Sequence, residues 1–302
     1  MSTKKPLAVV VLDGKVLCPD GIPDNEDTLK NTFHHAVSQV PDLLSQDHRV
    51  LVFHTNSPEI EDFPTFDTVV DLPMEIWDCN GEGAVGCMLQ GFLLAELTRR
   101  GIRCPVISLI PEVEIAAEDQ ALARPDHPFG EPYSAEQAKT LKRRKGWSFQ
   151  PLEDGRFRRL IPVPAPAAVG DLDIIRILLE NGAVVIAGAG NRMPRYCQVQ
   201  GESRQEEVFI DGHRLGALLS TSLEADALIV VTGQGESKLV EPGTMKETSE
   251  GPEAKILEAF LRTWRAGASE SPASQVSIGS RHAVAPPERA VHVFGDKSQG
   301  YA

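Results

Sequence analysis

Residues 7–12 read Leu7-Ala-Val-Val-Val-Leu12, a continuous apolar run without the alternation of a half-buried strand. A strand that is apolar on both faces is typical of a parallel sheet covered by helices on both sides. Similar runs recur at residues 50–54, 105–109, 183–187, 227–232 and 276–278. Together these runs predict a buried, mainly parallel β-sheet.

Amphipathic stretches separate the apolar runs. Residues 27–46 carry apolar side chains at Leu29, Phe33, Val37 and Val40, the i, i+3, i+4 spacing of a helix that lies on a sheet. The same pattern predicts helices at residues 83–101, 172–182, 215–223 and 252–266. Strands that alternate with helices predict an α/β fold, a three-layer α/β/α sandwich.

Two regions interrupt this alternation. Residues 125–159 combine proline, glycine, charged and aromatic residues, which favours an inserted lid or subdomain over a crossover helix. Residues 162–166 alternate prolines with small residues, which is typical of a stiff linker.

Charge and composition limit the partners. Lys and Arg number 30 against 43 Asp and Glu, and the net charge of −13 repels nucleic acid and anionic lipid. The first apolar run is too short for a signal-peptide core or a membrane span, so we expect a cytoplasmic protein. The 5 cysteines form no CxxC pair, which favours reduced thiols over a disulfide framework or a structural metal.

Two motifs in the middle of the chain resemble carbamate kinases. Arg124-Pro-Asp-His-Pro-Phe-Gly-Glu-Pro-Tyr133 resembles the lid of that family, and Gly155-Arg-Phe-Arg-Arg-Leu-Ile-Pro-Val-Pro164 resembles its arginine-rich strand and Pro-x-Pro turn. Segments 54–58, 210–219, 225–233 and 242–245 resemble further family motifs in the same order.

The resemblance implies the amino acid kinase fold in its carbamate kinase-like form, with a lid at about 125–160. It implies a substrate-side lobe over residues 1–214 and a reduced lobe over residues 215–302 on the nucleotide side of the family. It also implies a homodimer with helix 83–100 at the interface.

Three glycine-rich turns of the family are altered. Such turns let backbone amides close around a transferring phosphoryl group, because glycine has no side chain. The first, Leu-Gly-Gly-Asn-Ala in the family, reads Leu12-Asp-Gly-Lys-Val16. The second, His-Gly-Asn-Gly-Pro, reads His54-Thr-Asn-Ser-Pro58, and the third reads Gly188-Ala-Gly-Asn-Arg-Met-Pro194.

Family lysines are replaced as well. His127 stands where the lid lysine is expected, and Gly212-His213 follow Asp211 in place of Lys-Asp, whereas Lys255 matches the lysine of a late helix. The resemblance implies ATP and Mg²⁺ as cofactors, but the adenine-enclosing segment is shortened to residues 234–241, which argues against nucleotide binding.

The motifs of this chain that match or replace family motifs define the candidate site, which we expect to hold a small anion. The catalytic candidates are Lys15, His127, Asp211, His213 and Lys255. The substrate-binding candidates are Gly14, His54, Asn56, Ser57, Gly190, Asn191, Arg192 and Arg195. The cations among them would compensate for lost family lysines, or are ordinary surface residues, and the histidines suit acid–base chemistry near neutral pH.

Three other features are interpreted as parts of the structure and not as functional sites. The histidines with Asp13, Asp211 or Glu82 lack a diagnostic metal spacing, so no metal is predicted. Cys79, in the segment 77–82 before the predicted helix, is either a nucleophile or a plain loop thiol, and we favour the latter. The cations at 142–144, 156, 158 and 159 favour a salt-bridged lid over a nucleic-acid surface.

Three functions remain open. The chain is predicted to be a carbamate kinase-like enzyme with a diverged active site, acting on a small carbamoyl, carboxylate or phosphate-type anion without ATP. One alternative is a divergent ATP-dependent small-molecule kinase. The other is a catalytically inactive homologue that serves as a binding or regulatory subunit.

Overall fold

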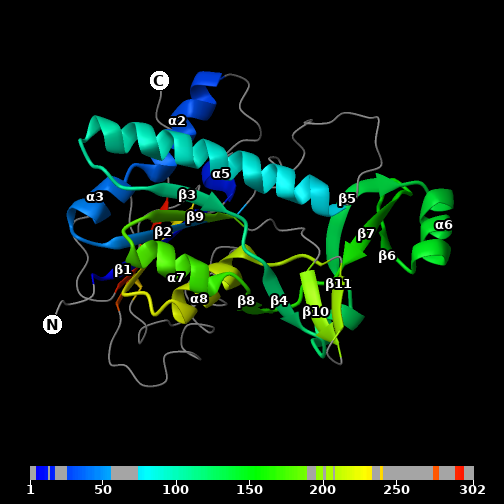
Figure 1. Ribbon diagram of the computed structural model, residues 1–302. Coiled ribbons are helices and arrows are strands. Elements are labelled where there is room, and N and C mark those ends of the chain that lie inside the picture. The colour runs from blue at the N-terminus through cyan, green and yellow to red at the C-terminus, as the bar shows by residue number, and fades with distance from the viewer. Residues whose placement is uncertain are drawn as a thin grey trace.

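The computed structural model describes residues 5–12, 14–17, 26–55, 74–188, 195–199, 202–206, 208–232, 239–240, 275–278 and 290–295. Its centre is an 8-stranded sheet in the order β13-β14-β15-β12-β1-β2-β9-β3 (Figure 1). The strands are β1 (Leu7–Leu12), β2 (Arg49–His54), β3 (Val106–Leu109), β9 (Val184–Gly188), β12 (Ala227–Thr232), β13 (Leu239–Val240), β14 (Gln275–Ile278) and β15 (Ala290–Gly295).

The predicted parallel sheet is confirmed. Every neighbouring pair in this sheet is parallel except β13 with β14. Each predicted apolar run forms one of its strands. Strands β13 and β15 were not predicted, because β13 has only two residues and His292 interrupts the short apolar pattern of β15.

Helices cover both faces of the sheet, which confirms the three-layer sandwich. Ala8, Val10 and Leu12 pack with α2 (Glu26–Val37), α3 (Val40–Ser45) and α5 (Met74–Arg99). Leu7, Val9 and Val11 pack on the opposite face with α7 (Leu172–Glu180) and α8 (Gly212–Ser222). Alternate side chains of a strand point to opposite faces, so one apolar run serves both layers. No helix in the described ranges is long and apolar enough to cross a membrane.

Two predicted helix boundaries are wrong. The helix predicted over 27–46 is divided into α2 and α3, and Pro41 lies in the first turn of α3, where proline begins a helix but cannot continue one. Helix α5 begins at Met74, not near residue 83, so Cys79 lies within a helix and not in a polar turn. The side chain of Cys79 lies outside the described part of the chain.

The interrupting region 125–159 forms its own small sheet at one end of the molecule (Figure 1). This 3-stranded sheet has the order β5-β7-β6 and consists of β5 (His127–Tyr133), β6 (Ser148–Pro151) and β7 (Phe157–Ile161), with α6 (Ala135–Lys145) between β5 and β6. Arg156 pairs with Asp154 at 2.7 Å. Arg159 is buried, and its Cζ lies 3.5 Å from the ring centroid of Trp147, a cation–π contact.

A 4-stranded sheet, in the order β11-β10-β4-β8, lies between the small sheet and the main body (Figure 1). Its strands are β4 (Val113–Ala116), β8 (Pro166–Val169), β10 (Arg195–Val199) and β11 (Glu202–Glu206). The expected lobe boundary at 214/215 falls inside α8, and β1 of the first lobe pairs with β12 of the second. The division into two lobes therefore stays a prediction.

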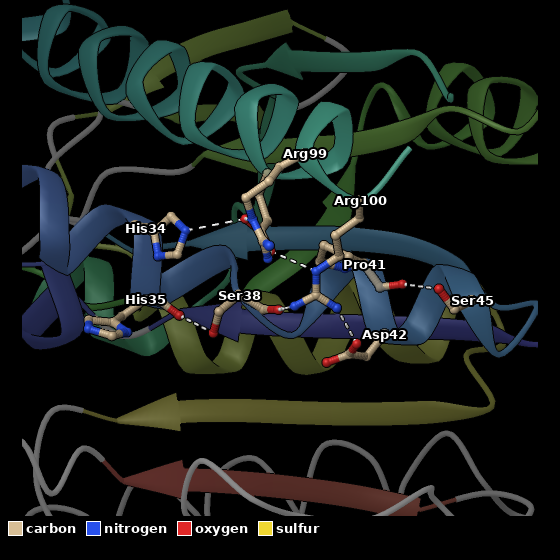
Figure 2. Close-up of polar contacts among 9 residues, drawn as sticks. His34, His35, Ser38, Pro41, Asp42, Ser45, Arg99 and Arg100 are labelled. Carbon is tan, nitrogen blue, oxygen red and sulfur yellow. Dashed lines mark hydrogen bonds and ion pairs between the residues drawn. The ribbon is translucent and has the colours of Figure 1, made fainter. Parts of the chain in front are cut away.

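An ion-pair network joins α2, α3 and α5 (Figure 2). Glu96 is buried and accepts hydrogen bonds from Arg99 Nε at 2.7 Å and Arg100 Nε at 2.6 Å. His34 Nε2 lies 3.4 Å from the same carboxylate, and Arg100 also pairs with Asp42. The hydrogen bonds from Arg99 and then Arg100 hold the pKa of Glu96 well below its usual range, although burial opposes this shift.

Candidate active site

The altered family turns emerge at one edge of the main sheet. In the sheet register Leu12 of β1 is opposite His54 of β2, and His54 is opposite Gly188 of β9. These are the C-terminal ends of parallel strands, the edge where α/β proteins place their ligand sites. Motifs that are far apart in the sequence therefore begin side by side.

His54 packs on a position where only glycine fits. Its side chain is completely buried, and a Cβ at Gly188 would lie 2.4 Å from His54 Nε2 and 2.5 Å from Cε1. Side chains do not approach this closely, so glycine at 188 allows the imidazole to lie over the end of β9.

Helix α5 closes the same position from the outer layer. A Cβ at Gly86 would lie 2.2 Å from Ser108 Oγ of β3 and 3.8 Å from His54 Nε2. Glu82 lies one turn before Gly86 and is 1% exposed. Residues at i and i+4 share a helix face, so α5 presents a buried carboxylate and a bare backbone to the edge that holds His54.

The first two altered turns are bonded to each other. Gly14, in the short helix α1 (Gly14–Leu17), donates its backbone N–H to Thr55 Oγ1 at 2.9 Å. Thr55 in turn donates its backbone N–H to Leu12 O at 3.0 Å and is 3% exposed. The side chain of Thr55 thus accepts the hydrogen bond of one backbone amide in the first turn.

The lid strand contacts the main body through His127. Its ring stacks on Phe209, with ring centroids 4.0 Å apart and planes inclined by 25°. Phe209 is fixed by a hydrogen bond from its N–H to Pro162 O at 2.9 Å. Two residues later, Asp211 Oδ1 accepts the N–H of Arg214 at 3.0 Å and so caps α8. Sequence reasoning missed Phe209, although it is an aromatic residue directly before the motif at 210–211.

Curated proteins resemble this chain over most of its length. It is 30% identical to a carbamate kinase of Staphylococcus haemolyticus over 239 residues, which cover 74% of this chain and 73% of the relative. The chain belongs to the carbamate kinase family. A second carbamate kinase, of Pyrococcus horikoshii, is 28% identical over 247 residues, 80% of this chain and 78% of the relative. No family model matches the sequence.

Solved carbamate kinase structures share the fold. The enzyme of Giardia lamblia, thiocarbamoylated by disulfiram, superposes with a TM-score of 0.72 at 17% identity, over 87% of this chain and 91% of that one. The same enzyme bound to AMP-PNP gives a TM-score of 0.70 at 17% identity, over 87% and 92%. The amino acid kinase fold expected from the motifs is thereby confirmed.

Several predicted site residues of this carbamate kinase-family chain are not placed. The described part contains the backbones, but not the side chains, of Lys15 in α1, Arg195 in β10 and His213 in α8. Residues outside the described ranges are Asp13, Asn56, Ser57, Gly190, Asn191, Arg192 and Lys255. The site residues that are placed fall into two groups, Gly14 and His54 at the sheet edge, and His127 and Asp211 around Phe209.

Among the described residues, no group of three or more His, Cys, Asp or Glu side chains is placed to hold a metal ion. Glu82 and His54 are both buried near the sheet edge, and Asp211 serves as a helix cap.

Proposed function

We propose that this chain is a carbamate kinase-like enzyme with a diverged active site, which acts on a small carbamoyl, carboxylate or phosphate-type anion without ATP. The anion would bind at the C-terminal edge of β1, β2 and β9. The hydrogen bond between Gly14 and Thr55 is the observation that carries this proposal.

The backbone amide of Gly14 already has a hydrogen-bond acceptor. By resemblance, Thr55 replaces a family glycine, and Gly14 belongs to the turn whose amides would face a phosphate. A hydroxyl that already accepts the Gly14 N–H at 2.9 Å competes with any phosphate oxygen for that donor. The described residues at this edge therefore fit a nucleotide phosphate poorly.

The remaining roles follow from residue chemistry. Lys15 and Asn56 would position the anion, and His127 would close over it from the lid strand. Asp211, which caps α8, would orient neighbouring groups, and Lys255 with Arg192 would neutralise developing negative charge. The homodimer stays a prediction.

Titration calorimetry separates this proposal from its alternatives. We expect the wild-type protein to bind carbamoyl phosphate and not ATP-Mg or ADP-Mg. Micromolar binding of ATP-Mg would contradict the proposal and favour a divergent kinase. Absence of binding to all three compounds would favour an inactive binding or regulatory subunit.

Substitutions of Thr55 test the effect of its hydrogen bond with Gly14 directly. Thr55→Gly restores the family residue and frees the Gly14 amide, so we expect phosphate-containing ligands to bind about tenfold more tightly, the value of one charge-assisted hydrogen bond. Thr55→Ser keeps the hydroxyl and is the matched control, with binding unchanged. Equal affinities in both variants would show that the Gly14 amide is not part of the anion site.

A further inference from the structure

A cavity of about 300 Å³ lies at the other edge of the main sheet, away from the candidate active site. Leu7 and Arg49, the first residues of β1 and β2, are opposite each other in the sheet register and form one wall. The ends of α7 and α8 form the other wall. The full lining consists of Leu7, Arg49, Arg176, Leu179, Leu223 and Glu224. This volume falls at the lower end of the range for small-molecule sites.

The framework of the cavity is held by hydrogen bonds. Leu7 and Asp226 exchange two of them, Leu7 N to Asp226 Oδ2 and Asp226 N to Leu7 O, both at 2.8 Å. Arg176 of α7 donates to Asp173 at 3.1 Å and to the carbonyl of Ser222 at the end of α8. The cavity walls are therefore positioned before any ligand binds.

The surface that the cavity exposes is mainly polar, and apolar residues lie packed behind it. Leu7 and Leu179 are each 1% exposed and Leu223 is 6% exposed. All belong to the core cluster that packs on α7 and α8. These side chains are already packed, so polar contacts and not further apolar burial would hold a ligand here.

The rim carries opposite charges that do not pair. Arg49 uses Nε to donate to Lys5 O at 2.9 Å, and its two terminal nitrogens have no hydrogen-bond or ion-pair partner among the described residues. The carboxylate of Glu224 also lacks a partner within the part of the chain that the structure describes. Arg49 and Glu224 thus line one small cavity without forming an ion pair with each other.

We propose that this cavity binds a small zwitterion. The ligand carboxylate would lie against Arg49, beside Arg176, and the ligand ammonium against Glu224. A ligand with only a negative charge would be attracted by Arg49 but repelled by Glu224. A ligand with only a positive charge would be attracted by Glu224 but repelled by Arg49. Only a ligand with both charges satisfies both groups in the same cavity.

Calorimetry on the full chain tests this with 4-aminobutanoate and L-valine as zwitterions. Butanoate and butylamine are the probes with one charge each. We expect at least one zwitterion to bind with a dissociation constant of about 1 mM or lower. We expect both single-charge probes to bind at least about tenfold more weakly, because each leaves one rim charge uncompensated.

Variants that remove one charge each test whether the zwitterion binds in this cavity. Arg49→Gln and Glu224→Gln should each weaken the zwitterion about tenfold or more. Arg103→Gln and Glu118→Gln remove the same charges from exposed positions outside the cavity lining and should leave the affinity unchanged. Thermal unfolding of each variant checks that it is folded.

Three results would overturn the proposal. They are no binding of either zwitterion, binding of butanoate as tight as that of the zwitterions, and an affinity insensitive to Arg49→Gln or Glu224→Gln. Carbamoyl phosphate binding, measured on the same variants, reports on the opposite edge of the sheet and should not change. Failure here is thereby distinguished from failure of the proposed function.

Discussion

The imidazole of His54 lies against the backbone of Gly188, close enough that a Cβ at 188 would lie 2.4 Å from Nε2. The two residues are register partners in β2 and β9, two adjacent parallel strands. A side chain at the end of one strand thus extends over the end of its neighbour, which requires that neighbour to be glycine.

Gly188→Ala should destabilise the protein. The added methyl group overlaps a completely buried ring, and such overpacking costs about 1–3 kcal/mol in the free energy of unfolding. Gly83→Ala is the matched control, because a Cβ there meets nothing within 4 Å and α5 should gain up to about 1 kcal/mol. Urea unfolding measures both, and equal stability of Gly188→Ala and wild type would contradict the packing described.

Gly86→Ala should be rescued by a change on β3. Alone it places a Cβ 2.2 Å from Ser108 Oγ and should cost about 1–3 kcal/mol. Ser108→Ala removes that oxygen, and the Cβ of residue 108 remains 3.4 Å away, an ordinary contact. A double-mutant cycle should therefore give a coupling energy of about 1 kcal/mol or more, whereas additive effects would exclude the contact.

Glu96→Gln should make the free energy of unfolding depend less on pH in the acid range. Because hydrogen bonds from Arg99 and Arg100 lower the folded-state pKa of Glu96, its charge stabilises the fold above the unfolded pKa of about 4.3, and this contribution is lost as the pH falls below that value. The variant should be about 2 kcal/mol less stable at neutral pH.

The difference between wild type and Glu96→Gln should shrink as urea unfolding is repeated from neutral pH down to about pH 3. Glu118→Gln, at an exposed position, is the control and should show no such trend. A difference that stays constant across this range would mean that the carboxylate charge of Glu96 is not what stabilises the α2–α3–α5 network.

Substitutions of His127 separate stacking from chemistry. His127→Phe keeps an aromatic ring against Phe209, so its melting temperature should stay near wild type, whereas His127→Ala should lose about 1 kcal/mol of stability. If the imidazole closes over the anion, both variants should bind carbamoyl phosphate more weakly. Wild-type binding by His127→Phe would limit the residue to a packing role.

Sequence patterns predicted the sheet and most helices because each side chain's burial follows the period of its element. The boundary between α2 and α3 was also accessible, since Pro41 marks a helix start. The long N-terminal extension of α5 was not, because its glycines and polar residues suit a turn equally well and only packing makes them helical. The contacts of Gly86 and Phe209 could not be predicted, because neither residue belongs to a periodic apolar pattern.

The layered α/β fold and the carbamate kinase resemblance could be inferred from residue order alone, because both depend on local pattern and motif order. Long-range contacts in the folded chain show that Thr55 accepts the amide N–H of Gly14, 41 residues away, and that Arg49 and Glu224 line one cavity. Such contacts depend on strand register and helix placement, which bring together residues that are distant along the chain. No local pattern specifies those atomic positions.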